Sequence, residues 1–292
     1  MRALVLGGSR FFGKRLVHFL IEKGWTVSVL NRGKAPDDFG RYVERIQCDR
    51  NDSRMMAQKV AGQKWDVIYD QICYDSRQAA AACEIFAGKV GRYVFTSSSS
   101  VYQPGPALKE EAFNPKEHYF DTVTESKDDY GEAKRQAESI FLIKAPFPVV
   151  AVRLPIVLGV NDYTQRLLFH LEHIRHGQPI HLPKSDVKMS FIDADDAAVC
   201  LQFLAESTFV GPVNAASPEP IALRELIRWI ESITKKKALL TQKPTEGDHS
   251  PFAIPTDWYL DVSRLRGLGF GAKPLDKWLP NLIHQLKAGL QT

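Results

Sequence analysis

The sequence predicts an α/β fold with a doubly wound parallel sheet, followed by a smaller and less regular C-terminal cap. Two observations lead to this prediction. The first half alternates short β-like runs with helical patterns, as parallel sheets with crossover helices do. After Pro155 the segments become longer and more irregular, with frequent proline and glycine. The 292 residues, 44% hydrophobic and 25% charged, have the composition of an ordinary soluble globular protein.

Six strands and four crossover helices are predicted in the first half. The strands are residues 3–7, 26–31, 43–48, 66–72, 93–97 and 149–155. The helices are residues 12–23, 53–61, 77–87 and 129–144, each long enough to join two parallel strands. In the second half, residues 222–234 carry one apolar stripe at helical spacing.

These elements suggest two domains. Residues 1–159 with about 190–217 form the first, and about 160–189 with 218–292 form a substrate-binding cap. Residues 103–127, rich in Pro, Glu and Asp, are predicted to be a long loop, and such loops are usually functional or mobile.

The first predicted strand ends in a glycine-rich turn that opens a helix. The turn reads Gly7, Gly8, Ser9, Arg10, Phe11, Phe12, Gly13. Glycines there let the backbone approach a pyrophosphate, and the helix N-terminus supplies free N–H groups. Glycine-rich turns occur at many strand-to-helix bends, so the turn alone is weak evidence for a nucleotide site. Its position directly after the first predicted strand makes that evidence stronger. The turn predicts a Rossmann-type dinucleotide site. Because Arg10 replaces the usual middle glycine, its side chain either points away from the phosphates or binds one of them.

The end of the second strand bears on the choice of cofactor. In NAD-binding folds an acidic residue here bonds the ribose 2′-hydroxyl, but this chain has Asn31 and Arg32, followed by Gly33 and Lys34. Arg32, with Arg10 or Lys34, is suited to a 2′-phosphate, which favours NADP over NAD; a solvated turn is the alternative. Asp49 and Arg50, after the third strand, are also assigned to the cofactor site, although Asp49 suits a turn or cap equally well.

A tyrosine and a lysine predict the chemical site. Of nine tyrosines only Tyr130 has a lysine four residues on, Lys134. On a helix these side chains are neighbours, and a nearby ammonium stabilises the phenolate that acid–base work at neutral pH requires. If Tyr130 and Lys134 were the only such feature, a chance pair on a surface helix would be the better interpretation. However, Ser98 ends the fifth predicted strand at the carboxyl edge, where open α/β sheets bind ligands. Its hydroxyl can donate to a substrate oxygen while Tyr130 gives or takes the proton.

The ordered set of motifs resembles the extended short-chain dehydrogenase/reductases, also called the NAD-dependent epimerase/dehydratase family. The matching segments are 7–13, 96–102, 130–134, 153–159, 191–196 and 213–216. The resemblance implies that Tyr130 is the acid/base, that Lys134 binds the nicotinamide ribose, and that Ser98 polarises the substrate oxygen. It places Pro155 at the nicotinamide. The implied enzyme is an NAD(P)-dependent reductase or epimerase that moves a hydride at a carbinol or carbonyl carbon, with a nucleotide-sugar or related sugar as the first substrate guess.

The chain also departs from that family's pattern. Ser99 and Ser100 stand where its dehydratases carry an Asp-Glu pair, so elimination of water is not expected. The run from Asp70 to Cys73 stands in place of a run of small residues on the fourth strand; together with Arg10 and with Asn31 and Arg32, it resembles an atypical branch. Asp195 and Asp196 are interpreted as a helix N-cap rather than as site residues.

A rival hypothesis comes from another functional class. It is a catalytically idle relative that keeps the dinucleotide and acts as an RNA- or protein-binding sensor. The complete set of Ser98, Tyr130 and Lys134 argues against it. The net charge of +4 is spread along the chain, so no nucleic-acid partner is expected.

Several further expectations follow from what the sequence lacks. His170, His173 and His176 diverge around a helix, so a partly exposed helix is predicted and no metal. The four cysteines are scattered and no segment could span a membrane, which favours a cytoplasmic protein with reduced thiols. A homodimer through helices 77–87 and 129–144 is expected from the family resemblance.

Overall fold

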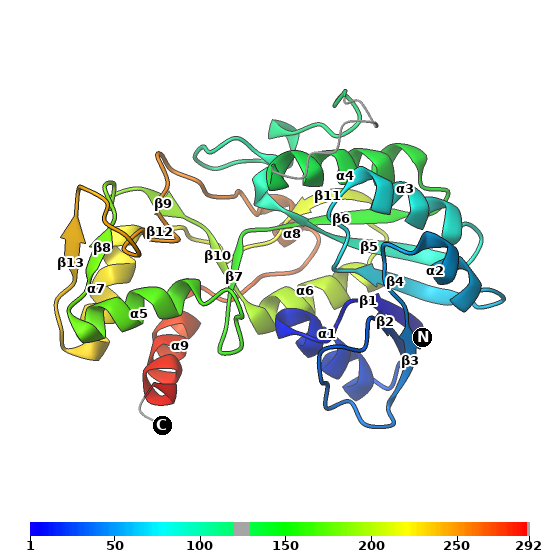
Figure 1. Ribbon diagram of the computed structural model, residues 1–292. Coiled ribbons are helices and arrows are strands. Elements are labelled where there is room, and N and C mark those ends of the chain that lie inside the picture. The colour runs from blue at the N-terminus through cyan, green and yellow to red at the C-terminus, as the bar shows by residue number, and fades with distance from the viewer. Residues whose placement is uncertain (120–128, 291–292) are drawn as a thin grey trace.

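The computed structural model describes residues 1–119 and 129–290, and its centre is a seven-stranded sheet (Figure 1). The strand order is β11-β6-β5-β4-β1-β2-β3, and every pair is parallel. The strands are β1 (Arg2–Leu6), β2 (Thr26–Asn31), β3 (Val43–Gln47), β4 (Trp65–Asp70), β5 (Val90–Ser98), β6 (Val149–Leu154) and β11 (Gly211–Asn214). The doubly wound α/β prediction is confirmed, and so are the six predicted strands. The prediction omitted β11.

Helices cover both faces of the sheet (Figure 1). On one face lie α1 (Phe11–Glu22) and α6 (Ala194–Glu206); on the other lie α2 (Ser53–Lys59), α3 (Ser76–Ile85) and α4 (Tyr130–Lys144). Side chains alternate between faces along a strand, so Ala3 and Val5 of β1 belong to one core while Leu4 and Leu6 belong to the other. Near-continuous apolar strands are what a sheet buried on both faces requires.

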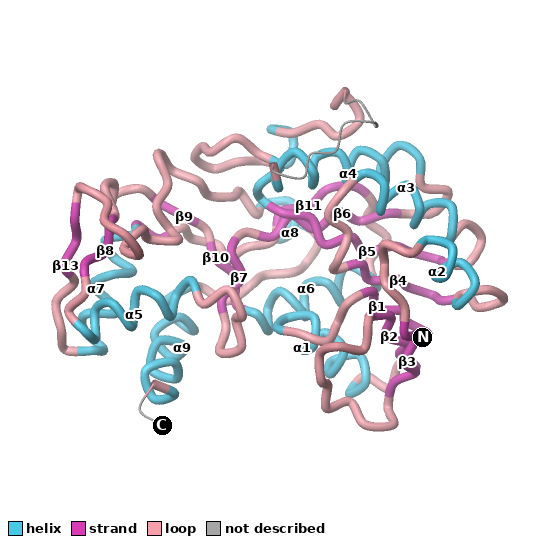
Figure 2. Tube along the Cα trace, viewed as in Figure 1, coloured by secondary structure: helices cyan, strands magenta, loops and turns pink. Residues whose placement is uncertain are grey.

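Outside the central sheet, the chain forms shorter strands (Figure 2) and a separate apolar core. The cap contains α5 (Arg166–His176), β8 (Pro179–His181), β9 (Lys188–Met189), β12 (Ile221–Ala222), α7 (Leu223–Thr234), β13 (Leu239–Thr241) and α9 (Leu275–Gly289), while α8 (Ser263–Gly267) lies beside β11. The short strands β7 (Ile156–Leu158) and β10 (Phe191–Asp193) fall in the ranges predicted for the first domain, but they pair with each other, and Leu158 and Phe191 belong to the core of the cap. The apolar stripe predicted on residues 222–234 is confirmed, because Leu223, Leu226, Ile227 and Ile230 are all buried.

One prediction about polar residues needs correction. The N-cap of α6 is Asp193, whose side chain accepts from the Asp195 backbone N–H, so Asp195 and Asp196 lie in the first turn and are not the cap. The three histidines lie on one partly exposed helix, α5, as predicted, although His170 itself is only 1% exposed. Its Nε2 is paired with the Ser250 hydroxyl.

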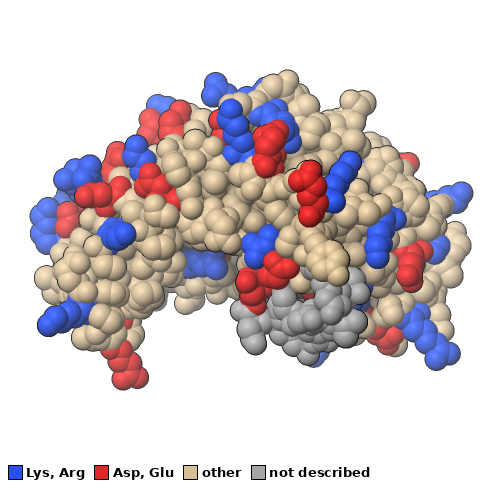
Figure 3. Space-filling view, turned by 90° about the horizontal axis from the view of Figure 1, so that it is seen from above, with Lys and Arg blue, Asp and Glu red and all other residues tan. Residues whose placement is uncertain are grey.

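The predicted long loop is described as far as residue 119, and its remainder, 120–127, lies outside the described residues. The 3-10 turn η1 (Ser99–Val101) precedes it, and it contains the 3-10 turn η2 (Glu110–Ala112). On the face seen in Figure 3, basic and acidic side chains are interspersed. Among the described helices, none combines the length and the apolar run that a membrane span needs.

Candidate active site

The turn between β1 and α1 has a backbone that only glycine adopts easily. Gly7 and Gly8 have φ values of 98° and 75°, in the left-handed region. A Cβ on Gly8 would lie 2.8 Å from a methyl carbon of Val5, and one on Gly7 would lie 2.9 Å from a methyl carbon of Ile72. Helix α1 follows at once, and the side chain of its N-cap residue, Arg10, makes no capping bond. The first N–H groups of α1 therefore remain for another acceptor.

A pocket of about 400 Å³ opens in front of this turn. It collects most of the residues that the sequence assigned to a cofactor: Gly7, Gly8, Ser9, Arg10, Phe11, Phe12, Gly13, Asn31, Arg32, Asp49 and Arg50. Lys134 and Pro155 are not in its lining. Other lining residues were not assigned from the sequence, among them Gln71, Tyr74, Gln78 and Tyr163.

The end of β2 is fixed to the glycine turn by a side-chain amide. Asn31 donates from Nδ2 to the Ser9 hydroxyl at 2.6 Å and accepts from the Gly33 N–H at 2.7 Å. The side chains of Arg10, Arg32 and Lys34 lie exposed at the pocket, and none forms an ion pair with another described residue. Three unpaired cations thus surround the end of β2, which carries no carboxylate.

The two residues assigned after the third strand have different surroundings. Asp49 accepts from the Asn51 N–H at 2.9 Å, which is the turn role that the sequence left open. Arg50 is buried and pairs with Asp70, its two terminal nitrogens each 2.7 Å from a carboxylate oxygen. Tyr93 donates its hydroxyl to the same carboxylate, and the ion pair keeps the pKa of Arg50 above its usual value despite burial. Because its charge is neutralised, Arg50 lines the pocket without offering a free cation.

Helix α4 places Lys134 under a set of aromatic rings. The helix begins at Tyr130, where the Asp129 side chain caps the Glu132 N–H. Lys134 is 2% exposed, and its Nζ donates to the carbonyl oxygens of Cys73 at 2.7 Å and Thr96 at 2.9 Å. The same nitrogen lies 5.8 Å from the Tyr130 ring centre. A buried ammonium and a half-exposed phenol are therefore neighbours at the carboxyl end of the sheet.

The turn that follows β5 lies against the start of α4. Ser98 ends β5, and its hydroxyl accepts from the Ser100 N–H at 3.1 Å. A Cβ on Gly131, the residue after Tyr130, would lie 2.6 Å from the Ser100 carbonyl oxygen. Arg135 of α4 donates to the Val101 carbonyl at 3.3 Å. The segments that carry Ser98 and Tyr130 are thus in direct contact.

A buried polar network lies behind Ser98. The Ser97 hydroxyl donates to Glu138 at 2.6 Å, and Glu138 forms an ion pair with Arg153 in which both side chains are fully buried. Arg153 also donates to the Tyr102 hydroxyl at 2.7 Å and the Glu110 carbonyl at 2.8 Å. The hydrogen bonds of the Glu138 carboxylate and the Arg153 guanidinium thus link β5, α4, β6 and η2. Neither Glu138 nor Arg153 was assigned a role from the sequence, although Glu138 is one helical turn beyond Lys134.

Two further aromatic residues border the pocket near Lys134. The Tyr74 ring centre is 5.0 Å from Lys134 Nζ, and the Tyr163 ring makes an edge contact with Phe11. Burial, followed by the charges of Tyr163 and Tyr130, raises the pKa of Tyr74 to about 12. Tyr74 therefore remains a neutral hydrogen-bond donor at neutral pH.

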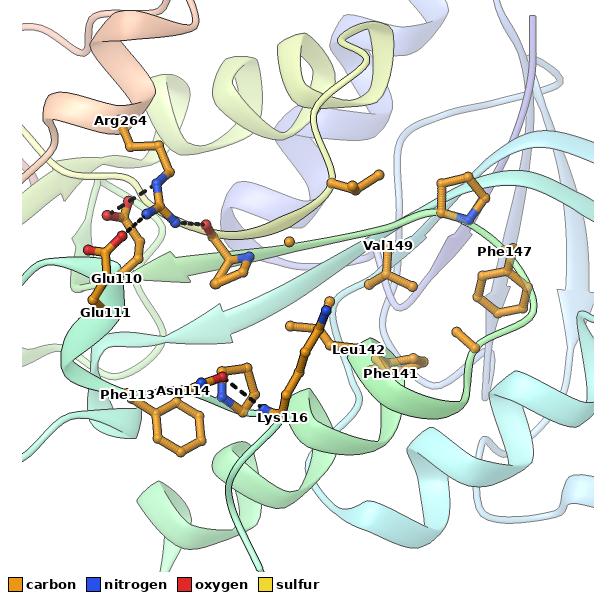
Figure 4. Close-up of a pocket in the computed structure, with 16 residues that line it drawn as sticks. Glu110, Glu111, Phe113, Asn114, Lys116, Phe141, Leu142, Phe147, Val149 and Arg264 are labelled. Atoms are coloured by element: carbon orange, nitrogen blue, oxygen red, sulfur yellow. Dashed lines mark hydrogen bonds and ion pairs between the residues drawn. The ribbon is translucent and has the colours of Figure 1, made fainter.

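A larger cavity, about 630 Å³, lies at the amino ends of β6 and β11 (Figure 4). Phe141, Leu142 and Phe147 line one side. On another, Arg264 is paired with Glu110 and Glu111. Neither the glycine turn nor the set of Ser98, Tyr130 and Lys134 reaches this cavity, so size alone does not mark the chemical site.

The sequence is similar to two curated proteins. It is 23% identical to the chloroplast stem-loop binding protein of 41 kDa b from Arabidopsis thaliana over 205 residues, which are 65% of this chain and 50% of that protein. It is 28% identical to the 2-alkyl-3-oxoalkanoate reductase of Stenotrophomonas maltophilia (strain K279a) over 259 residues, 79% of this chain and 74% of that one. The chain thus spans about half the length of the first relative.

Solved structures share the fold, and a family match covers most of the chain. A UDP-glucose 4-epimerase from Thermotoga maritima, solved with UDP-glucose, aligns with a TM-score of 0.78 and 18% identity over 99% of this chain and 100% of that one. A UDP-glucuronic acid 4-epimerase from Bacillus cereus, solved with NAD, aligns with a TM-score of 0.76 and 16% identity over 98% and 99%. Since residues 3–216 match the NAD dependent epimerase/dehydratase family, the chain belongs to that family, and the resemblance of its motifs is confirmed.

Proposed function

We propose that this protein is an NAD(P)-dependent reductase or epimerase that acts at a carbinol or carbonyl carbon, with Ser98, Tyr130 and Lys134 as catalytic residues. One observation carries the proposal. The buried ammonium of Lys134 lies 5.8 Å from the Tyr130 ring, and the Ser98 turn contacts the start of the same helix. This arrangement brings a phenol, an ammonium and a serine hydroxyl to one edge of the sheet, as proton transfer to or from a substrate oxygen requires.

The pocket beside this helix fits a dinucleotide. The positive φ values of Gly7 and Gly8 form the tight turn between β1 and α1, and the free N–H groups of α1 suit a pyrophosphate. Once bound, the nicotinamide ring would supply or accept the hydride. The pocket lining extends from the residues that follow β2, where we place the adenosine, to Tyr74, which lies beside Lys134.

Each catalytic residue has a distinct task. Tyr130 gives its hydroxyl proton to the substrate oxygen when a carbonyl is reduced, and takes it back when a carbinol is oxidised. Lys134 binds the nicotinamide ribose: two of its three N–H bonds are already used by the Cys73 and Thr96 carbonyls, leaving the third for a ribose hydroxyl. Ser98 donates to the substrate oxygen and orients it.

We propose NADP as the preferred cofactor, with NAD as the alternative. The support is the positive charge around the end of β2, where Arg10, Arg32 and Lys34 lack ion-pair partners among the described residues. In addition, Asn31 stands at the position where a carboxylate would repel a 2′-phosphate. A guanidinium pairs with phosphate in a bidentate manner, which makes Arg32 the leading contact.

The substrate is proposed to lie between the carboxyl edge of the sheet and the cap. The structural relatives solved with UDP-glucose or named for UDP-glucuronic acid support a nucleotide-sugar. The reductase relative supports a 3-oxo acid as the competing choice. The idle, RNA-binding alternative is supported by the similarity to the stem-loop binding protein. The mixture of charges on the face in Figure 3 offers RNA no basic stripe.

The test begins with the purified protein and the mass of any nucleotide that it retains. Deuterium-labelled NADPH or NADH is then supplied with UDP-sugars and, separately, with 3-oxo acids. A reductase transfers the label and consumes the cofactor stoichiometrically, whereas an epimerase converts the sugar without net consumption. If the protein binds a nucleotide but converts none of these substrates, and binds a structured RNA or a protein, the idle alternative replaces the proposal.

A further inference from the structure

Gln71 occupies a place that the proposed function has not used. It follows β4, and its backbone N–H donates to the carbonyl of Leu6, the last residue of β1, at 3.1 Å. This bond keeps Gln71 beside the glycine turn. Its side chain lies across Gly13, where a Cβ would lie only 2.0 Å from Gln71 Oε1. The carboxamide therefore rests in the space left by the absent side chain of Gly13.

The amide nitrogen of Gln71 has no partner. Nε2 is buried and makes no hydrogen bond with the described residues. Buried polar groups are nearly always paired, because an unpaired donor loses its bonds to water without compensation. Gln71 also lines the 400 Å³ pocket with the glycine turn. A donor that is unpaired in the free protein and lies at a pocket is suited to a ligand acceptor.

Packing alone does not require an amide here. The next residue, Ile72, fills the equivalent space over Gly7, where a Cβ would lie 2.9 Å from its Cγ2. An apolar side chain can therefore cover this turn. The amide supplies an N–H donor, which the apolar neighbour lacks.

The charge distribution indicates why a neutral donor would matter. The one buried cation that lines the pocket among the described residues, Arg50, is neutralised by Asp70. The unpaired cations are exposed: Arg32 and Lys34 follow β2, and Arg10 lies in the glycine turn itself. A buried, neutral side-chain donor would therefore add to the backbone N–H groups and the exposed Arg10 in stabilising an anion at the turn.

We propose that Gln71 is a binding residue for the pyrophosphate of the dinucleotide, to which it donates from Nε2. The inference rests on the proposed function, since it requires that a dinucleotide occupy the pocket. It gives a role to one of the larger residues that replace a run of small ones after the fourth strand.

The experiment compares three variants of the full chain. Q71M keeps the size but removes the donor, and Q71E keeps the shape but adds a negative charge. Q202M is the matched control, because the Nε2 of Gln202 in α6 is also buried and unpaired, but Gln202 does not line the pocket. Binding is measured for NADPH by fluorescence and by calorimetry for 2′-phospho-ADP-ribose, which retains the pyrophosphate, and for adenosine 2′-monophosphate, which lacks it.

Q71M is expected to bind NADPH and 2′-phospho-ADP-ribose about tenfold more weakly than the wild type, as loss of a hydrogen bond to a charged group implies. Q71E should lose more, because its carboxylate repels the pyrophosphate. Adenosine 2′-monophosphate should bind equally to all variants, and Q202M should match the wild type throughout. Since Nε2 is unpaired in the free protein, Q71M should unfold at the wild-type temperature or above, which separates lost affinity from lost structure.

Three results would overturn the inference. Unchanged or tighter NADPH binding by Q71M would mean that Gln71 only packs against the turn or obstructs it. An equal loss for adenosine 2′-monophosphate would mean that it acts by shaping the pocket. Both leave the proposed function intact, provided the wild type binds NADPH or NADH. If the wild type binds neither nucleotide, the inference and the proposed function fail together.

Discussion

The sheet domain and the cap bury polar groups in different ways. The sheet side encloses full ion pairs, Arg50 with Asp70 and Arg153 with Glu138, together with the ammonium of Lys134. In the described part of the cap, the ion pairs lie at the surface, as in Arg224 with Asp186, and the one buried carboxylate, Asp248, accepts hydrogen bonds from Thr245 and has no ion-pair partner. Burying a charge is costly unless it is paired. Paired charges are therefore buried where the sheet meets the proposed chemistry, whereas the cap is stabilised mainly by apolar packing.

The largest expected effect tests the sheet side of this comparison. Replacing Arg153 by Met should leave Glu138 buried without its partner and lower the free energy of unfolding by about 3–5 kcal/mol. Urea denaturation measures the change. R224M is the control, because that pair is exposed, and it should cost less than about 1 kcal/mol. Equal losses in the two variants would remove the distinction between the regions.

The next prediction concerns the neutral groups of the cap. Burial lowers the pKa of His170 to about 4, from an unfolded value near 6.5. Between these values the unfolded chain binds the proton and the folded chain does not, so stability rises with pH and is lost as pH falls from 6.5 to about 4. The loss should reach about 3 kcal/mol. Comparing urea unfolding of H170Q and wild type across this range isolates the contribution; parallel curves would show that His170 does not carry it.

A smaller effect is expected at the unpaired cations around the nucleotide pocket. R32A should weaken NADPH binding by about 1.5–3 kcal/mol, as loss of a charge-assisted hydrogen bond implies, and leave NADH nearly unchanged. Fluorescence titration of both nucleotides measures the selectivity. K184A, whose lysine is exposed on the cap, serves as the control. An equal loss of affinity for NADPH and NADH would contradict a role for Arg32 in binding the 2′-phosphate.

Most of the fold could be predicted because its signals are local. The six strands found from sequence are apolar runs, and the stripe on α7 has clear helical spacing. Strand β11 is only four residues, Gly211–Asn214, and contains a proline, so no run marks it. The α6 cap was placed two or three residues late because three aspartates lie close together at its start and only the hydrogen bond distinguishes Asp193.

The candidate site was less predictable where it depends on distant partners. The glycine turn and the pair of Tyr130 and Lys134 are local patterns. Arg50 was assigned to the cofactor, but its charge is taken by Asp70, a partner 20 residues away that no periodicity reveals. Likewise, the importance of Glu138 depends on Ser97 and Arg153, on two different strands. Gln71 stood out as a departure from small residues, but its unpaired amide is a property of packing.

The most direct test of the account is the effect of Y130F on turnover and on nucleotide binding together. With the substrate that the wild type converts, the account predicts a fall in kcat of about 10²–10⁴, since the acid–base hydroxyl is lost, while NADPH binds as before. A variant that retains wild-type turnover would contradict the assignment of Tyr130 and, with it, the proposed chemistry.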